Sequence, residues 1–392
     1  TILALYDRIS VFHTLSPWIL GLHRAAWPEA QAEAMADTAA EAVQGVRGRV
    51  PDGPPRLTFT DDPEWCLRRD RNEYLVVVRR FLKPPITDLD LMARLRQRYR
   101  RIFFLNGNAG GGLHRPEVLP LVDRFYTKAV FTDLSLYQRH LYGGELFTHR
   151  NHHDHGVEDP NPVIPDAVAE HDLSKIHVHW NIGVGDFPRR KTLQRIGVAL
   201  ARMPGGGPRL SRPIIHREEM LNPLVPDWIA EDEYRYDVNA RLGRPGYPTI
   251  AHHREVLTEV LDGAAHRHGW NVARDRVPAR RYLADMKRSR ITFSPFGWGE
   301  VCFRDFEAVR AGSLLIKPDM SHLRTWPDIF VPGETYVPVR WDGGDLEEQI
   351  AYYLDHAEER IRIVTAAHRR FREQLQQVPK RTARLLGDLV AE

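Results

Sequence analysis

The chain has 392 residues, of which 42% are hydrophobic and 27% are charged, and this composition suits a globular protein of two ordinary domains. Its 55 Lys and Arg residues nearly balance its 52 Asp and Glu residues, so the formal net charge of +3 gives no argument for a nucleic-acid partner, although it allows a local basic cleft for a phosphorylated ligand. The two cysteines, Cys66 and Cys302, exclude a disulfide framework. No apolar run reaches the roughly 18 residues of a membrane span. We therefore expect a cytoplasmic protein and leave open peripheral contact with the inner membrane.

The first half alternates short apolar runs with helical patterns. The sequence predicts strands over residues 2–6, 74–78, 101–105, 129–131 and 176–180, and helices over 28–46 and 88–99. Continuous apolar strands that alternate with helices are typical of a parallel sheet covered on both faces. We therefore predict a doubly wound α/β domain.

A Gly- and Pro-rich stretch over residues 204–250 marks the predicted domain boundary. It separates an N-terminal domain, 1–207, from a C-terminal domain, 208–392, with a linker at about 208–233. The second half resumes the same rhythm, with strands within 234–242 and over 291–295 and 314–316, and helices over 253–269, 278–288, 301–310, 346–354 and 358–376 and at the chain end. The fold class predicted for the whole chain is α/β with two Rossmann-like doubly wound domains.

The strand, loop and helix over residues 291–316 form the most informative stretch. On a helical wheel, Glu300, Arg304 and Glu307 share a stripe about 60° wide on a helix that is otherwise largely apolar. Such a stripe is costly to bury unless it pairs internally or lines a cleft. Glycines at the start of a helix let a phosphate approach the free backbone N–H groups, which favours a nucleotide site over an internal salt-bridge stripe.

These residues also carry a family resemblance. The segment 294–297, the acidic pair Glu300 and Glu307, and the segment 311–316 resemble the C-terminal signature of GT-B glycosyltransferases. The Arg304-x-x-Glu307 form resembles exostosin-type and bacterial capsule transferases. The two glutamates are seven residues apart, whereas the common retaining signature spaces them eight apart, which leaves open whether the enzyme retains or inverts.

The resemblance covers about residues 290–370 and implies a GT-B enzyme whose two domains face each other across a cleft. It implies a nucleotide-sugar co-substrate (UDP-, GDP-, dTDP- or CMP-sugar) and transfer of the sugar to a bacterial surface glycan, such as lipopolysaccharide O antigen or capsule, or to a lipid-linked glycan. We expect phosphate over Gly297 to Glu300, phosphate or sugar oxygens at Arg304 and ribose at Glu307. The predicted donor-binding residues are Ser294, Gly297, Gly299, Glu300, Arg304, Glu307, Lys317 and Ser321.

Other polar residues are candidates for the cleft. Asn106 and Asn108 belong to a Gly-rich loop after a strong strand, and His152 lies in a histidine-rich segment that otherwise reads as an exposed polar loop. Asn239 and Arg241 alternate with Asp237 on one strand face. The predicted acceptor or cleft residues are Asn106, Asn108, His152, Asn239 and Arg241, and the candidate catalytic carboxylates are Asp237, Glu158 and Asp154.

We expect no metal and no cofactor besides the nucleotide sugar. The histidine-rich segment around His149 to His155 lacks a zinc spacing, and no Asp-x-Asp motif ends a convincing strand. His177 and His179 are expected to be core or edge histidines whose hydrogen bonds are made within the protein. Asp186 follows in the next loop.

Three alternatives stay open at this stage. The first is a CMP-Kdo-dependent retaining Kdo transferase, resembling bacterial β-Kdo transferases, in which Asp237 would be a covalent nucleophile. The second is a non-catalytic nucleotide-sugar-binding module of a polysaccharide assembly complex. The third is a sugar epimerase, which would need a donor but no acceptor.

Overall fold

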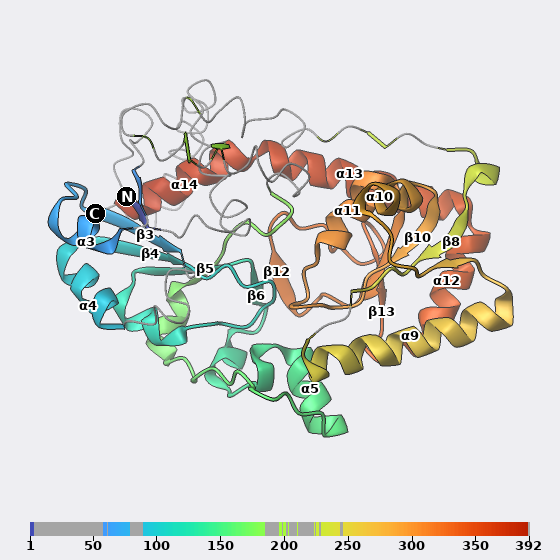
Figure 1. Ribbon diagram of the computed structural model, residues 1–392, viewed down its shortest axis with the longest axis horizontal. Coiled ribbons are helices and arrows are strands. Elements are labelled where there is room, and N and C mark those ends of the chain that lie inside the picture. The colour runs from blue at the N-terminus through green and yellow to red at the C-terminus, as the bar shows by residue number, and fades with distance from the viewer. Residues whose placement is uncertain are drawn as a thin grey trace, which may run out of the picture.

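A computed structural model describes most of the chain (Figure 1). The described residues are 1–3, 58–60, 62–78, 89–184, 229–243 and 246–390, with the short pieces 196–197, 199–200, 203, 210, 223 and 225–226. The helix predicted over 28–46, Asp186 and the predicted boundary at 207–208 lie outside them.

The first domain is built on a six-stranded sheet in the order β2-β1-β3-β4-β5-β7, and every pair of neighbouring strands is parallel. The strands are β1 Ile2–Leu3, β2 Phe59–Thr60, β3 Tyr74–Val78, β4 Arg101–Leu105, β5 Arg124–Thr127 and β7 Ile176–Val178. The helices are α3 Pro63–Arg68, α4 Leu89–Arg98 and α5 Leu146–His155, with short 3-10 turns η3 Pro116–Leu121, η4 Leu134–Gln138, η5 Tyr142–Gly144 and η6 Glu170–Lys175. Residues 75–78 and 102–105 are buried throughout, as expected for parallel strands covered on both faces.

The second domain is built on a five-stranded sheet in the order β13-β11-β10-β8-β9, also with parallel neighbours. The strands are β8 Tyr236–Asn239, β9 Val272–Ala273, β10 Ser289–Phe293, β11 Leu314–Pro318 and β13 Val337–Val339. The helices are α9 Pro248–His268, α10 Ala279–Lys287, α11 Phe303–Ala311, α12 Leu346–Asp355 and α13 Ala357–Gln376, with the short turn η7 Glu231–Glu233. Helix α14, Val378–Val390, follows them along the chain. The predicted class of two doubly wound α/β domains is confirmed.

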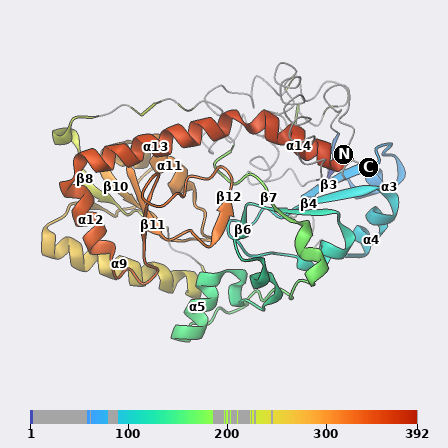
Figure 2. The ribbon, with the colours of Figure 1, turned by 180° about the vertical axis from the view of Figure 1, so that it is seen from behind.

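The last helix returns to the first domain, which the sequence did not indicate. Figures 1 and 2 show α13 and α14 in line along one side of the molecule, with α14 beside β3 and β4 and with both chain termini in the first domain. Arg101 donates to the Asp388 carbonyl at 2.8 Å, and Arg381 donates to the Val178 carbonyl at 2.8 Å. The first domain therefore combines both ends of the chain.

Two further contacts join the domains. The segment 129–131, predicted as a strand of the parallel sheet, forms β6 and pairs antiparallel with β12, Leu323–Thr325, from the second half of the chain. Below it, Asp159 accepts from the Thr249 backbone N–H at 3.0 Å and from its hydroxyl at 2.7 Å. The first domain thus supplies the side-chain cap for the N-terminus of α9.

Helix α11 begins later than predicted. Cys302 is its N-cap, with extended backbone angles, and the Asp305 carboxylate accepts from the Cys302 N–H at 2.9 Å. Because the helix begins at Phe303, Glu300 lies in the preceding loop. The predicted three-residue stripe is therefore reduced to Arg304 and Glu307.

Candidate functional site

A cavity of about 490 Å³ lies between the two domains. The first domain contributes Ala109, Lys128 and Ile182, which follow the carboxyl ends of strands β4, β5 and β7. The second domain contributes Arg241, Gly243, Arg254, Tyr282, Gly297, Trp298, Val301, Cys302, Phe303, Arg304 and Glu307. This is the edge at which doubly wound sheets bind their ligands.

The charges around this cavity are unequal. Among the described residues, four cationic side chains line it (Lys128, Arg241, Arg254 and Arg304), against one carboxylate, Glu307. Cations gathered in a concave space between low-dielectric walls raise the local concentration of anions. The cavity therefore suits a ligand with more than one negative charge.

Arg304 and Arg254 are held by neutral groups. Arg304 donates to the Arg241 carbonyl at 3.1 Å and to the Ser294 hydroxyl at 3.5 Å. Arg254 donates to the Phe296 carbonyl at 2.8 Å and to the Gly243 carbonyl at 2.5 Å. Burial lowers the pKa of Arg254, and the nearby charge of Arg304 lowers it further. Carbonyl and hydroxyl partners fix a guanidinium without neutralising it, so both charges stay available to an anion.

Arg241 differs from this pair because it has an acidic partner. Its guanidinium contacts the Asp285 carboxylate at 2.8 Å, and its Nε donates to the Asp275 carbonyl at 2.8 Å. Its third nitrogen, Nη1, is buried and has no hydrogen-bond partner among the described residues. Arg241, one of the expected cleft residues, lines the cavity, but it adds less net charge than Arg254 or Arg304.

Glu307 lies one helical turn after Arg304 on α11. The Tyr282 hydroxyl donates to one of its oxygens at 3.1 Å. Burial raises the pKa of Tyr282, so the phenol stays protonated and continues to donate. A carboxylate oriented in this way beside the cavity can accept hydrogen bonds from ligand hydroxyl groups.

The predicted glycine loop forms one wall of the cavity. A Cβ at Gly297 would lie 2.7 Å from Arg254 Nη2, so a larger residue there would require the guanidinium to shift. Trp298 is 66% exposed and packs edge-on against Tyr247, with ring centroids 5.2 Å apart. The loop thus combines close backbone approach with an exposed aromatic surface.

Lys317 and Ser294, predicted to contact the donor, are instead buried beneath this loop. Lys317 Nζ lies 3.2 Å from Asp305 and donates to the Ser294 carbonyl at 3.2 Å, and neither side chain of the ion pair is exposed. The Ser294 hydroxyl donates to Asp305 at 2.6 Å. Both residues support the loop and lie outside the cavity lining, because their polar groups are used by Asp305.

His253 supports the same loop from α9. Its ring stacks on Phe296 at 4.9 Å, and its Nε2 accepts from the Phe296 N–H at 3.3 Å. Burial lowers the pKa of His253 to about 3, with a further contribution from Lys317. The imidazole is therefore neutral, as an acceptor requires.

Glu300 and Ser321, two further predicted donor contacts, also lie outside the cavity lining. Glu300 is fully buried and faces Gly111 and His322. Ser321 is exposed, and its backbone N–H donates to Asp319 at 3.3 Å. Gly299 packs against the first domain, so the phosphate surface predicted over 297–300 reduces to Gly297 and Trp298.

The predicted carboxylate catalysts do not line the cavity. Asp237 accepts from the Asn271 N–H at 2.8 Å and pairs with Arg290 at 3.1 Å. Asp154 is exposed near the end of α5 and pairs with Arg150, and Glu158 is exposed in the following loop. Their carboxylates serve local structure or solvent, so none is brought to the site.

The predicted cleft residues are divided in the same way. Arg241 lines the cavity, whereas Asn106, Asn108 and Asn239 are buried behind it. Asn108 donates to Glu145 at 2.7 Å, and Asn239 accepts from the Arg241 N–H at 3.4 Å. His152 stacks on Tyr142 at 3.8 Å, away from the cavity lining.

Sequence reasoning missed Lys128, Arg254, Tyr282 and Ile182 as cavity residues. Lys128 directly follows β5, so the carboxyl-end rule for parallel strands could have found it. Arg254 lies inside α9, where no linear motif distinguishes it from other helical arginines.

The described residues contain no group of three or more His, Cys, Asp or Glu side chains placed to hold a metal ion. In the same part of the chain, none of the helices combines the length and apolar character needed to span a membrane.

Comparisons with known proteins place the resemblance in the second domain. Residues 246–387 match the family of glycosyl transferase-like proteins. No curated protein matches the sequence. This segment includes Arg254 and the cavity wall from Gly297 to Glu307.

Several solved structures have similar chains. One is a UDP-forming α,α-trehalose-phosphate synthase from Burkholderia vietnamiensis, with 12% identity and a TM-score of 0.37 over 81% of this chain and 72% of that chain. Another is Anabaena HepE in complex with UDP-glucose, with 11% identity and a TM-score of 0.35 over 83% of this chain and 94% of that chain. The chain's own strand order gives two parallel sheets, with a cavity between them.

Proposed function

We propose that this chain is a glycosyltransferase that binds a nucleotide sugar in the interdomain cavity. The observation that carries the proposal is the set of four cations and one carboxylate that the described residues place around that cavity. Of these, Arg254, Arg304 and Glu307 lie in the segment that matches glycosyl transferase-like proteins. A nucleotide sugar has the corresponding features, because its phosphates are anionic and its ribose carries hydroxyl groups. We propose that no metal or other cofactor takes part.

The phosphates would lie between Arg254 and Arg304. Both guanidiniums are fixed before the ligand arrives, so they can stabilise the charge that develops on the leaving phosphate with little reorganisation. Glu307 would accept hydrogen bonds from the ribose hydroxyls, oriented by Tyr282. The cavity lies between two domains, and their closure around the donor would exclude water.

The acceptor side would be the first domain, which contributes Ala109, Lys128 and Ile182 to the cavity. We propose a growing bacterial surface glycan as acceptor, such as lipopolysaccharide O antigen or capsule. The form Arg304-x-x-Glu307, which resembles that of bacterial capsule transferases, supports this choice.

A thermal-shift screen against UDP, GDP, dTDP and CMP tests the donor site. We expect one nucleotide to raise the melting temperature of the wild-type chain, with about 2.7 kcal/mol of stabilisation at a hundredfold excess over its Kd. Glu307→Ala should lose most of that shift, because the ribose hydroxyls lose their acceptor. The matched control is Glu348→Ala, an exposed glutamate on α12, which should keep it.

Two outcomes would contradict the proposal at different levels. An equal shift in Glu307→Ala and the wild type would remove the ribose role of Glu307. Stabilisation by none of the four nucleotides would reject the donor site itself. Release of free nucleotide from the matching nucleotide sugar distinguishes a transferase from a module that only binds the donor.

A further inference from the structure

Two loops that line the cavity, one from each domain, contact each other through their backbone atoms. The first contains Ala109 and Gly110, and the second contains Gly299 and Val301. A Cβ at Gly299 would overlap the backbone of Ala109 and Gly110. The Val301 N–H donates to the Ala109 carbonyl at 3.1 Å. Ala109 and Val301 both line the cavity, so any separation of these two loops changes its wall.

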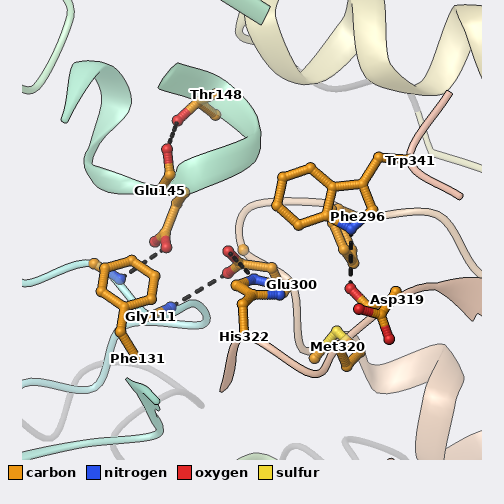
Figure 3. A network of polar contacts seen from close by, with 12 residues as sticks. Gly111, Phe131, Glu145, Thr148, Phe296, Glu300, Asp319, Met320, His322 and Trp341 are labelled. Atoms are coloured by element: carbon orange, nitrogen blue, oxygen red, sulfur yellow. Dashed lines mark hydrogen bonds and ion pairs between the residues drawn. The ribbon is translucent and has the colours of Figure 1, made fainter. Parts of the chain in front are cut away.

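Two buried carboxyl groups meet beneath this contact, one from each domain (Figure 3). Glu145, at the start of α5, is 3% exposed, and Glu300 is fully buried. A Cβ at Gly110 would overlap Glu300 Oε2 and would lie 2.5 Å from Glu145 Oε1, so both side chains converge on the same glycine.

The groups that bind this pair do not balance two negative charges. Glu145 accepts from the Asn108 amide and the Gly112 N–H, each at 2.7 Å, and both donors are neutral. Glu300 accepts from the Gly111 N–H at 3.3 Å, and the His322 ring lies 3.4 Å from its other oxygen. Two ionised carboxylates in one buried space repel each other, so such pairs hold a proton.

The pKa of Glu145 agrees with this geometry. Burial raises the pKa of Glu145 well above its usual range, and the charge of Glu300 raises it further. The other titratable groups that face the pair are His322, which precedes β12, and Tyr137 in η4, whose hydroxyl donates to the Gly111 carbonyl at 2.8 Å. The charge of Arg324 of β12 also acts on Tyr137.

We propose that Glu145 and Glu300 are positioning residues whose carboxyl groups share one proton and thereby hold the two cavity loops together. Loss of that proton places two charges side by side and drives the loops apart at Ala109 and Val301. Donor binding then weakens as the pH rises. The inference rests on the proposed function for this readout, because the ligand measured is a nucleotide.

The sign of the pH effect follows from linkage. The folded-state pKa of Glu145 is raised above its unfolded value of about 4.5, so the folded chain binds the extra proton between the two values. The stability contributed by the neutral form is complete below the unfolded pKa. It is lost as the pH rises through the folded pKa.

Glu300→Gln is the decisive variant, because its amide can donate to Glu145 but cannot ionise. We expect the affinity of the wild type for the nucleotide found above to fall with rising pH, by at most about tenfold per pH unit for one proton. Glu300→Gln should keep the low-pH affinity throughout, and Glu300→Ala should lose affinity at every pH. Titration calorimetry across the pH range measures all three, with Glu348→Gln as an exposed control that follows the wild type.

The infrared band of a protonated carboxylic acid gives a readout without nucleotide. We expect the folded wild type to show this band at neutral pH. If no nucleotide binds, this band and the pH dependence of thermal unfolding still test the pair, so failure of the proposed function is distinguishable from failure of this inference.

Three results would overturn the inference. The first is a pH profile of Glu300→Gln identical to that of the wild type. The second is absence of the acid band from the wild type. The third is loss of the pH dependence in His322→Gln while Glu300→Gln keeps it, which would assign the titration to the histidine.

Discussion

Gly299 lies where the backbone of one domain touches that of the other. Any side chain there meets the main chain of Ala109 and Gly110. Backbone atoms cannot move aside as the end of a flexible side chain can. The residue therefore decides how closely the two cavity loops approach each other.

We predict that Gly299→Ala destabilises the chain by about 1–3 kcal/mol, the usual cost of an added methyl group in a packed site, and weakens nucleotide binding. Urea denaturation measures the first effect and the thermal-shift screen the second. Gly246→Ala is the matched control, because a Cβ there meets no atom within 4 Å, and its stability should change by less than about 1 kcal/mol. Equal effects of the two substitutions would show that the loops do not touch as described.

At the scale of elements, the start of α11 determines which residues reach the cavity. Asp305 caps the Cys302 N–H at 2.9 Å and accepts from Ser294 at 2.6 Å. Lys317 of β11 compensates its charge at 3.2 Å, inside the protein. One buried carboxylate thus joins the strand, the loop and the helix. Because the helix begins at Phe303, Arg304 lies in its first turn, beside the cavity.

We predict that Lys317→Met destabilises the chain by about 3–5 kcal/mol, because it leaves the Asp305 carboxylate buried without its cation. The control is Arg340→Met, whose ion pair with Asp342 is 66% and 43% exposed and should contribute less than about 1 kcal/mol. Urea denaturation of both variants gives the comparison. A cost for Lys317→Met as small as that of the control would mean that Asp305 is neutral or hydrated.

This junction also explains what the sequence could and could not predict. The strands of both sheets were predictable, because continuous apolar runs such as 101–105 have no alternative to burial on both faces. The glycine loop and Glu307 were predictable from their spacing after β10. The position of the Glu300 side chain was not predictable, because it depends on where the helix begins. The capping bond at Cys302 starts the helix at Phe303 and leaves Glu300 in the loop.

The sequence also could not predict which cations come together in the cavity. Lys128 and Arg254 are separated by more than a hundred residues and come from different domains, so only the packing of the two sheets brings them together. Asp237 looked like a cleft residue on its strand, but Arg290 and the Asn271 N–H engage its carboxylate. Local patterns specify elements, whereas partners from distant segments decide which polar groups remain for a ligand.

For the whole molecule, the chain's path from one domain to the other and back ties the domains together. Helix α14 follows the second domain but packs into a core that includes the strands of the first. Leu386 and Leu389 are 3% and 5% exposed there. Helix α14, the β6–β12 pair and the Asp159 cap on α9 are thus three separate contacts between the domains.

We predict that Leu386→Ala costs about 2–5 kcal/mol of stability, as for other leucines removed from a packed core. The loss should show in the first domain although the residue lies near the C-terminus, because α14 contacts β4 there. Urea denaturation gives the cost, and hydrogen exchange at residues 101–105 locates it. The control is Ile361→Ala on α13, where the side chain is 43% exposed and the change should stay within about 0.5 kcal/mol. Unchanged exchange at 101–105 in a destabilised Leu386→Ala protein would mean that α14 stabilises the second domain alone.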